Sequence, residues 1–249
     1  MRHLLLVITI IFFASCTQYK KIVYLQNEDT GDSIQVAAIE KYKLMPGDLL
    51  HVKVYSPDQS INAMFNFDVD QNRSNYNEVS IYLSGFQLDE QSNIELPIIG
   101  KISLQNKTMA EARKIISDSV DSYVNEAIVI SKLLSYRVTV LGEVSRTGIV
   151  NVYRNHSTIF DVLSTVGDIN SLGDRRRVEV LRQTGPVKTK HIIDLTKFEA
   201  INNPAYNIYP GDIVYVKPLR AKIFRENIPI ITLSLTTVTT FLLILNYIK

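Results

Sequence analysis

The sequence is poor in the residues that most often build catalytic or cross-linked sites. It has 249 residues and a single cysteine, which has no partner in the chain for a disulfide. Its formal net charge is only +2, which argues against a nucleic-acid-binding surface. No nucleophile elbow, phosphate-binding glycine loop or dinucleotide fingerprint is present. The histidines show no metal-ligand spacing and are scattered at His3, His51, His156 and His191. We therefore predict no catalytic residues, no metal and no enzyme activity.

The N-terminal apolar run, Leu4 to Ala14, precedes the lone cysteine, Cys16. It is shorter than the roughly 20 residues that a helix needs to cross a bilayer, and it is typical of a secretory signal. The residues Phe13-Ala14-Ser15-Cys16 resemble the lipobox at which bacterial lipoproteins are cleaved and acylated. We predict a lipoprotein signal peptide over 1–15, a covalent lipid on Cys16, no other cofactor, and a lipidated linker over 16–38. The alternative is an ordinary secretory signal that leaves a cysteine nearby.

The C-terminal run, Ile228 to Ile248, contains no charged residue. At about 1.5 Å per residue its helix would be about 31 Å long, which is enough to cross a bilayer. We predict a membrane-spanning helix over 228–248, with Asn227 as its cap and Pro229 in its first turn.

This run is unusual because polar, uncharged side chains interrupt its aliphatic residues. Five of them fall on one broad face of a helix: Thr232, Thr236, Thr239, Thr240 and Asn246. In one interpretation this face lines a water-filled lumen made by several copies of the helix. In the other, each hydroxyl bonds back to a carbonyl of its own helix in a single anchor. The sequence leaves both open.

One phrase occurs twice between the two apolar ends. The chain reads YKLMPGDLLHVKV from Tyr42 and YNIYPGDIVYVKP from Tyr206. Pro-Gly suits a type II turn, the following aspartate can bond to nearby backbone, and an apolar strand follows. We predict structural turns, not a catalytic carboxylate pair, at Pro46, Gly47, Asp48, Pro210, Gly211 and Asp212.

The remaining pattern predicts an α+β protein with two small domains, over 39–133 and 134–219. In the first, a capping box at Thr108 and Glu111 begins a helix, and 68–77 forms a loop. In the second, a helix follows Thr158, and Arg175-Arg176-Arg177 forms a solvated turn before a strand. The first domain has predicted strands over 49–55, 79–83, 94–96, 98–104 and 127–133. The second has predicted strands over 137–144, 149–153, 178–182, 190–194 and 213–216, compatible with a β-grasp.

Four phrases in this order resemble the outer-membrane polysaccharide export family. They are YKLMPGDLLHVKV, LPIIGKISLQNKTMAEARKII from Leu96, RVTVLGEVSRTGIVNV from Arg137 with TIFDVLSTVG, and YPGDIVYVKP. The resemblance implies that 39–133 is a polysaccharide export domain and 134–219 one soluble-ligand-binding β-grasp domain, both periplasmic. It implies an outer-membrane lipoprotein that forms a homo-oligomeric ring, with the C-terminal helices crossing the outer membrane and the C-terminus at the cell surface.

The same resemblance implies the partners of the chain. They are the exported capsular or extracellular polysaccharide and an inner-membrane co-polymerase, often a tyrosine autokinase in that family. The resulting hypothesis is transport through an oligomeric translocon without catalysis. The alternative is a membrane-tethered periplasmic glycan-binding protein that forms no pore.

Overall fold

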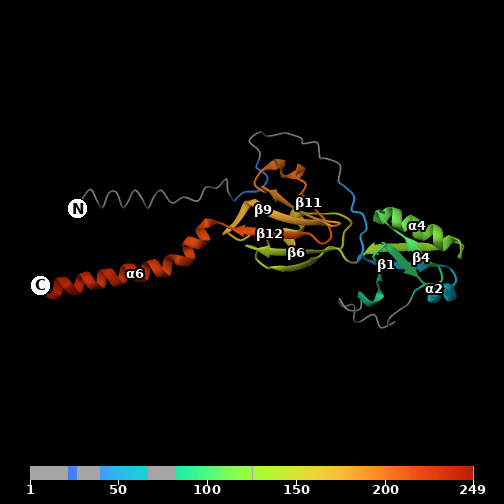
Figure 1. Ribbon diagram of the computed structural model, residues 1–249, viewed down its shortest axis with the longest axis horizontal. Helices are drawn as coiled ribbons and strands as arrows, with labels where there is room; N and C mark the ends of the chain where they lie inside the picture. The colour runs from blue at the N-terminus through green and yellow to red at the C-terminus, as the bar shows by residue number, and fades with distance from the viewer. Residues whose placement is uncertain (1–21, 27–39, 67–81, 125, 249) are drawn as a thin grey trace.

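The computed structural model describes residues 22–26, 40–66, 82–124 and 126–248, which form two groups of strands and helices and one projecting helix (Figure 1). The buried apolar side chains fall into two clusters. One extends in sequence from Leu44 to Val129, and the other from Tyr136 to Val216. Leu133, between them, packs against both.

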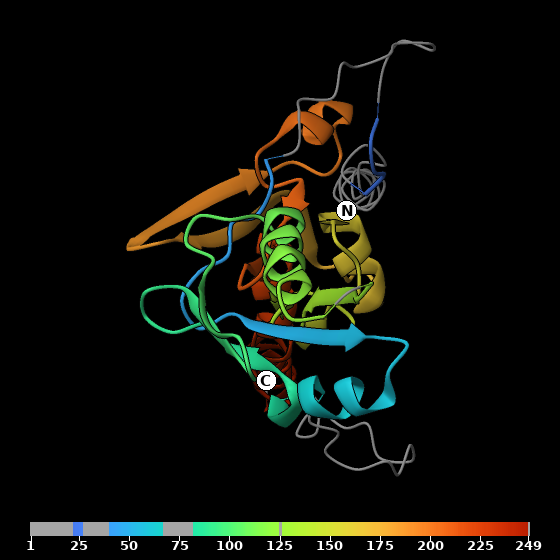
Figure 2. The same ribbon diagram turned by 90° about the vertical axis from the view of Figure 1, so that its right-hand side faces the viewer.

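The first cluster lies among β1 (Leu49–Tyr55), α2 (Gln59–Phe65), β2 (Phe86–Gln87), β3 (Asn93–Leu96), β4 (Gly100–Ser103), α4 (Met109–Asp121) and β5 (Ile128–Leu133). Strand β1 is the centre of an antiparallel sheet with the order β2-β1-β5, and it leads into α2 (Figure 2). The capping box of α4 is confirmed, because Glu111 accepts from the Thr108 N–H at 2.7 Å and Thr108 accepts from the Glu111 N–H. Helix α4 buries Ala112, Ile116 and Val120.

The second cluster lies among β6 (Arg137–Gly142), β7 (Gly148–Asn151), β8 (Ser157–Thr158), α5 (Ile159–Thr165), β9 (Gly173–Thr184), β10 (Val187–Ile193), η2 (Phe198–Asn202), β11 (Asn207–Ile208) and β12 (Ile213–Pro218). Its five-stranded sheet has the order β10-β9-β12-β6-β7, with β12 parallel to β6 and the other pairs antiparallel. A parallel pair formed by the first and last strands, next to one helix, is compatible with the predicted β-grasp.

A short N-terminal segment, Ile22–Gln26, which we call the strap, lies against the second group of elements. Its backbone donates from Leu25 to the Leu195 carbonyl at 3.1 Å and from Gln26 to the Thr196 carbonyl at 2.7 Å. Tyr24 donates its hydroxyl to Asp168 and packs edge-to-face on Phe160, with 5.5 Å between ring centroids. The strap therefore holds the N-terminal part of the chain against α5 and the segment after β10.

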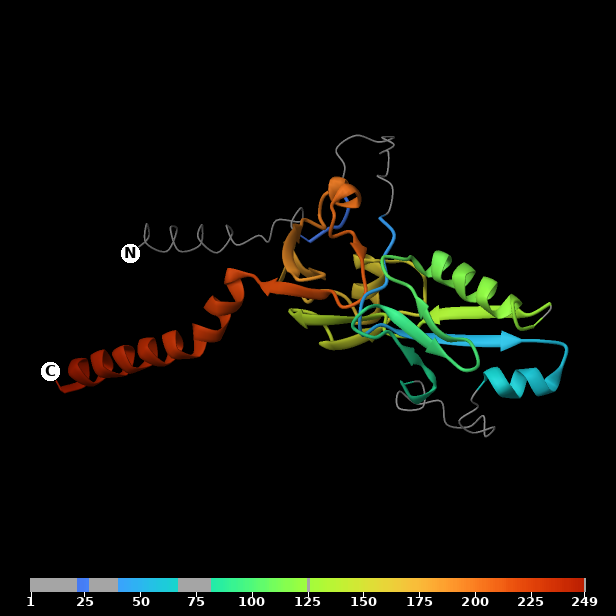
Figure 3. The ribbon, with the colours of Figure 1, turned by 45° about the vertical axis from the view of Figure 1, so that its right-hand side comes forward.

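Helix α6 (Arg220–Ile248) is longer than predicted, and its predicted start is wrong. Asn227 is not its cap, and Pro229 lies inside the helix rather than in its first turn. An internal proline lacks the N–H for the bond to the residue four positions back, and its ring crowds that carbonyl, so it bends a helix. Figure 3 shows a bend between the start of α6 and its long outer part. The charged first turns before Pro229 thus continue into the apolar run.

Two other local predictions need correction. Tyr82 and Leu83, predicted to lie in a strand, are helical, and β2 pairs with β1 instead. The predicted strand from Ile98 to Leu104 is shorter, because Ile98 has a positive φ of 68° in the turn before β4. The predicted loop over 68–77 lies outside the described residues.

The three consecutive arginines are not a solvated turn. Strand β9 begins at Gly173, so Arg175 lies within it with a side chain only 8% exposed. Its guanidinium donates to the Ile169 carbonyl at 2.7 Å, lies 3.7 Å from Asp168 and covers the Tyr24 ring. Arg176, the next residue of the strand, faces the other side and is half-buried, and Arg177 is exposed, so Arg175 alone of the three is buried.

Candidate functional site

The outer part of α6 is an apolar helix that nothing in the described part of the chain covers. Its large apolar side chains from Ile228 to Ile248 are all exposed, including Leu235, Phe241 and Leu242. The helix is long and apolar enough to cross a membrane. Exposed apolar surface of this extent marks a membrane or protein contact in folded proteins.

The hydroxyls of this helix bond to its own backbone. Thr232 donates to the Ile228 carbonyl at 2.8 Å, and Thr240 donates to the Thr236 carbonyl at 2.8 Å. Thr236 and Thr239 make the same kind of bond one turn back. This is the arrangement expected for a single anchor. It uses the hydroxyl proton and leaves the oxygen lone pairs able to accept from water or from another helix.

The base of α6 is fixed to the five-stranded sheet. Lys222 Nζ lies 2.5 Å from Glu143 Oε1, and this carboxylate raises the pKa of Lys222. The Leu219 N–H donates to the Leu172 carbonyl at 2.7 Å just before the helix begins. The direction in which α6 leaves the body is therefore set by contacts with the loop before β9 and the end of β6.

The first repeated turn is held by a buried carboxylate. Asp48 accepts from the Met45 N–H, the Tyr42 hydroxyl and the Ser135 hydroxyl, each at 2.9 Å. Burial raises the pKa of Asp48, and these three donors act in the opposite direction. Gly47 has a φ of 87°, as a type II turn requires.

The second repeated turn has the same plan with a stronger partner. Asp212 is 1% exposed and accepts from the Tyr209 N–H at 2.9 Å. Arg182 donates to both carboxylate oxygens, at 2.8 and 3.1 Å. Burial raises the pKa of Asp212, while Arg182 lowers it. Gly211 has a φ of 82°. The bonds that Asp48 and Asp212 accept hold the two turns and tie each of them to a distant part of the chain.

Comparison with known proteins relates the first group of elements to a protein family. Residues 36–133 match the family of polysaccharide biosynthesis and export proteins. They form a polysaccharide export domain. Members of this family are transport proteins, not enzymes.

Two curated relatives share one name, EPS I polysaccharide export outer membrane protein EpsA. The protein from Ralstonia nicotianae is 27% identical over 165 residues, which cover 63% of this chain and 42% of the relative. The protein from Ralstonia solanacearum is 24% identical over 193 residues, which cover 74% of this chain and 49% of the relative. The chain therefore spans about half the length of the curated relatives that it matches.

The two repeated turns meet where the export domain joins the second group of elements. Ser135, in the junction, accepts from the Leu49 N–H at 3.2 Å and donates to Asp48. On the other side, the Gly211 N–H donates to the Arg137 carbonyl at 2.8 Å. The repeated phrase thus supplies one turn to each side of the junction.

The predicted site residues form two separate groups in the structure. The turn residues lie at the junction, and the polar residues of α6 lie along the projecting helix (Figure 1). Cys16 lies outside the described residues, so its lipid stays a prediction. Sequence reasoning missed Ser135 and Arg182, because each reaches its aspartate from a distant part of the chain.

Proposed function

We propose that this chain is an outer-membrane lipoprotein whose copies form an oligomeric translocon for capsular or extracellular polysaccharide. The observation that carries the proposal is an exposed apolar helix, α6, fixed to a folded body in a chain with a polysaccharide export domain. The names of the curated relatives support both the export role and the outer membrane. In this proposal the two folded groups lie in the periplasm.

A ring of helices is a physically sound way to cross the bilayer. Every backbone group of a helix is paired within the segment, whereas an open sheet would leave edge groups unpaired in lipid. The back-bonded hydroxyls suit this role, because their donors are already used and only acceptor lone pairs remain. With several copies of α6 side by side, Thr236, Thr240 and Asn246 would face the lumen, and Leu242 and Leu245 would face lipid.

Three further features complete the proposal. A lipid on Cys16 would hold the protein in the membrane, and the periplasmic body would form a homo-oligomeric ring. An inner-membrane co-polymerase, in the form of a tyrosine autokinase or a related protein, would deliver the polymer.

The competing function is a membrane-tethered glycan-binding protein without a pore. The hydroxyl bonds of α6 favour it, because a lone helix in lipid needs the same internal bonds. The two functions differ in which membrane surface the C-terminus reaches.

The deciding experiment places a small epitope after Lys249 and measures antibody access to intact and permeabilised cells. The translocon proposal expects labelling of intact cells, because α6 must then cross the outer membrane. Labelling only after permeabilisation would contradict the proposal and favour the tethered binding protein.

A matched pair of substitutions tests the lumen-facing side. A lysine near the middle of a lipid-facing helix costs about 2.5–3.5 kcal/mol on insertion scales. We therefore expect Leu242→Lys to abolish surface polysaccharide and Thr236→Lys to retain most of it. Equal loss in both variants, at equal protein levels, would place Thr236 in lipid and count against the pore.

A further inference from the structure

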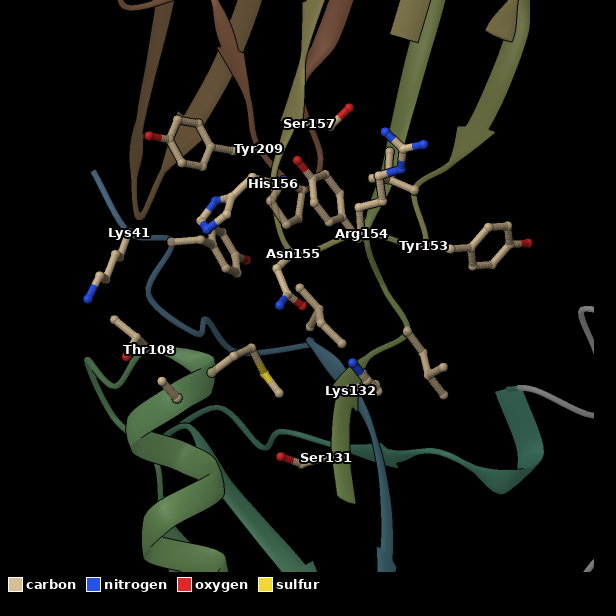
Figure 4. A pocket seen from close by; sticks show the side chains of 18 of the residues that line it. Lys41, Thr108, Ser131, Lys132, Tyr153, Arg154, Asn155, His156, Ser157 and Tyr209 are labelled. Carbon is tan, nitrogen blue, oxygen red and sulfur yellow. The ribbon is translucent and has the colours of Figure 1, made fainter. Parts of the chain in front are cut away.

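A cavity of about 510 Å³ lies at the junction between the export domain and the second group of elements (Figure 4). Its volume is within the roughly 300–1,000 Å³ of small-molecule sites. The end of β5, the first turn of α4 and the loop before β8 contribute its walls, with the second repeated turn at one side. Of the site residues predicted from the sequence, Pro210 lines the cavity, and it was predicted only as part of a turn.

The side chains that can carry charge near neutral pH in the lining of the cavity are all basic. Among its lining residues there is no aspartate or glutamate, whereas the bases are Lys41, Arg113, Lys132, Arg154, His51 and His156. Burial and nearby Lys53 lower the pKa of His51, which disfavours its charged form. The lysines and arginines of the lining carry a positive charge at neutral pH.

Several carboxylates stand just outside the cavity. Asp48 and Asp212 are held in the repeated turns, and Glu40 lies near Tyr209. Two others are bound at helix starts. Asp161 accepts from the Thr158 N–H at 2.8 Å and lies 3.7 Å from Arg154. Glu111 accepts from the Thr108 N–H at 2.7 Å. Arg113 and Lys132 form no ion pair with another described residue, and an anion could neutralise these two side chains.

Two uncharged features of the wall also suit an anion. Thr108, Met109 and Ala110 line the cavity, so the first turn of the 13-residue helix α4 borders it with the positive end of the helix dipole. On β5, Ser131 is 1% exposed, and its hydroxyl has no hydrogen-bond partner among the described residues. A buried hydroxyl without a partner costs free energy, and a ligand oxygen would satisfy it.

Tyrosines give the cavity the character of a sugar site. Tyr42 donates its hydroxyl to Asp48, Tyr136 to the Ile208 carbonyl, and Tyr209 to the Glu40 carbonyl at 2.7 Å. These bonds fix the rings. Tyr136 is 6% exposed and Arg182 covers one face of Tyr209, so the faces left for a ligand are those of Tyr42 and the other side of Tyr209. Fixed aromatic faces pack against the C–H faces of sugar rings, and neighbouring polar side chains such as Asn155 can bond to sugar hydroxyls.

We propose that this cavity binds a carboxylate-bearing sugar residue of the exported polysaccharide. The cations, the helix terminus and the free hydroxyl bind the carboxylate, and the tyrosine rings pack on the sugar. The inference rests on the proposed function for the source of the sugar, but the site itself does not depend on the pore.

The test is calorimetric binding of tetragalacturonate to the purified full chain in detergent, with cellotetraose as the neutral probe and inorganic phosphate as the sugar-free anion. We expect tetragalacturonate to bind at least tenfold more tightly than either comparison compound. Arg113→Gln and Lys132→Gln should each weaken its binding about tenfold. The charge-matched control Lys188→Gln, on the β9–β10 hairpin that extends from the side of the sheet (Figure 2), should leave binding unchanged.

Ser131→Ala separates a role in binding from a role in stability, because ligand affinity and the thermal midpoint can be measured on the same variant. Because this hydroxyl has no partner in the described part of the free protein, the substitution should weaken tetragalacturonate binding while the thermal midpoint stays the same or rises. Absent tetragalacturonate binding, equal binding of cellotetraose or phosphate, or equal weakening by Lys188→Gln would each overturn the proposal. The outcome is independent of the epitope experiment, since a chain that binds the acidic sugar but does not expose its C-terminus would lose only the translocon function.

Discussion

Replacing Arg182 with methionine should destabilise the second cluster by about 3–5 kcal/mol, the cost of removing one partner of a buried ion pair. The guanidinium is 13% exposed, donates to both oxygens of Asp212, and also donates to the Asn207 carbonyl at 2.7 Å. It also lies over the Tyr209 ring, 4.2 Å from its centroid. Methionine fills much of the same volume, so the expected loss comes mainly from a buried carboxylate that keeps the Tyr209 N–H as a donor but loses the guanidinium.

The loss should depend on pH with a definite sign. An aspartate in the unfolded chain has a pKa near 3.9. Burial raises the pKa of folded Asp212, and removing Arg182 removes an interaction that lowers it. Between the unfolded and folded pKa values the folded variant binds more protons, so its stability falls as pH rises. The deficit relative to wild type should therefore be smaller at pH 5 than at pH 8.

The assay is denaturant unfolding of the full chain in detergent, followed by tyrosine circular dichroism, for wild type, Arg182→Met, Asp212→Asn and the double variant. The double variant should recover part of the loss, with a coupling of about 1–3 kcal/mol, because no carboxylate is then left buried. A deficit below about 1 kcal/mol for Arg182→Met, or one that is the same at both pH values, would refute the reasoning.

Two further predictions concern single backbone positions and caps. Gly142→Ala should lower the free energy of unfolding by at least about 2 kcal/mol in denaturant unfolding. Its φ is 94°, and a Cβ there would lie 2.0 Å from the Val216 carbonyl oxygen. The control Gly185→Ala, with φ 59° and open space around the new Cβ, should cost about 1 kcal/mol. Bonds from Thr158 lower the pKa of Asp161, so its stabilisation is complete above the unfolded pKa and is lost as pH falls through the lower folded value. Asp161→Asn should cost less than about 1 kcal/mol at pH 7. In this variant the thermal midpoint should fall less between pH 5 and pH 2 than it does in the wild type. An equal fall in both proteins would contradict the prediction.

Features fixed by neighbouring residues could be predicted from the sequence. The capping box at Thr108, the helix start at Thr158 and the turns at Gly47 and Gly211 involve residues three or four positions apart, and the structure has them as predicted. Strand β1 also has its predicted limits, because its apolar residues alternate cleanly.

Features that depend on distant contacts could not be predicted. Arg182 lies 30 residues from Asp212, and no local pattern distinguishes it from a solvated arginine of the same hairpin. Arg175 was predicted to be solvated but is buried for the same kind of reason, since its burial depends on Asp168 and on Tyr24 of the strap. The cavity at the junction brings together several separate segments, each of which is an ordinary loop, strand end or helix start by itself.

The strap has a mechanical consequence for the proposed membrane protein. Tyr24 of the strap bonds to Asp168, the nearby Asn170 N–H donates to the Glu143 carbonyl, and the Glu143 side chain holds Lys222 at the base of α6. Only five residues separate Cys16 from the strap, so a lipid there could lie no more than about 20 Å from Ile22. The lipid on Cys16 and helix α6 would then attach the folded part of the chain to the membrane at two neighbouring points. Two points of suspension prevent the swivelling that one tether allows, and they keep the export domain directed away from the membrane, toward whatever delivers the polymer.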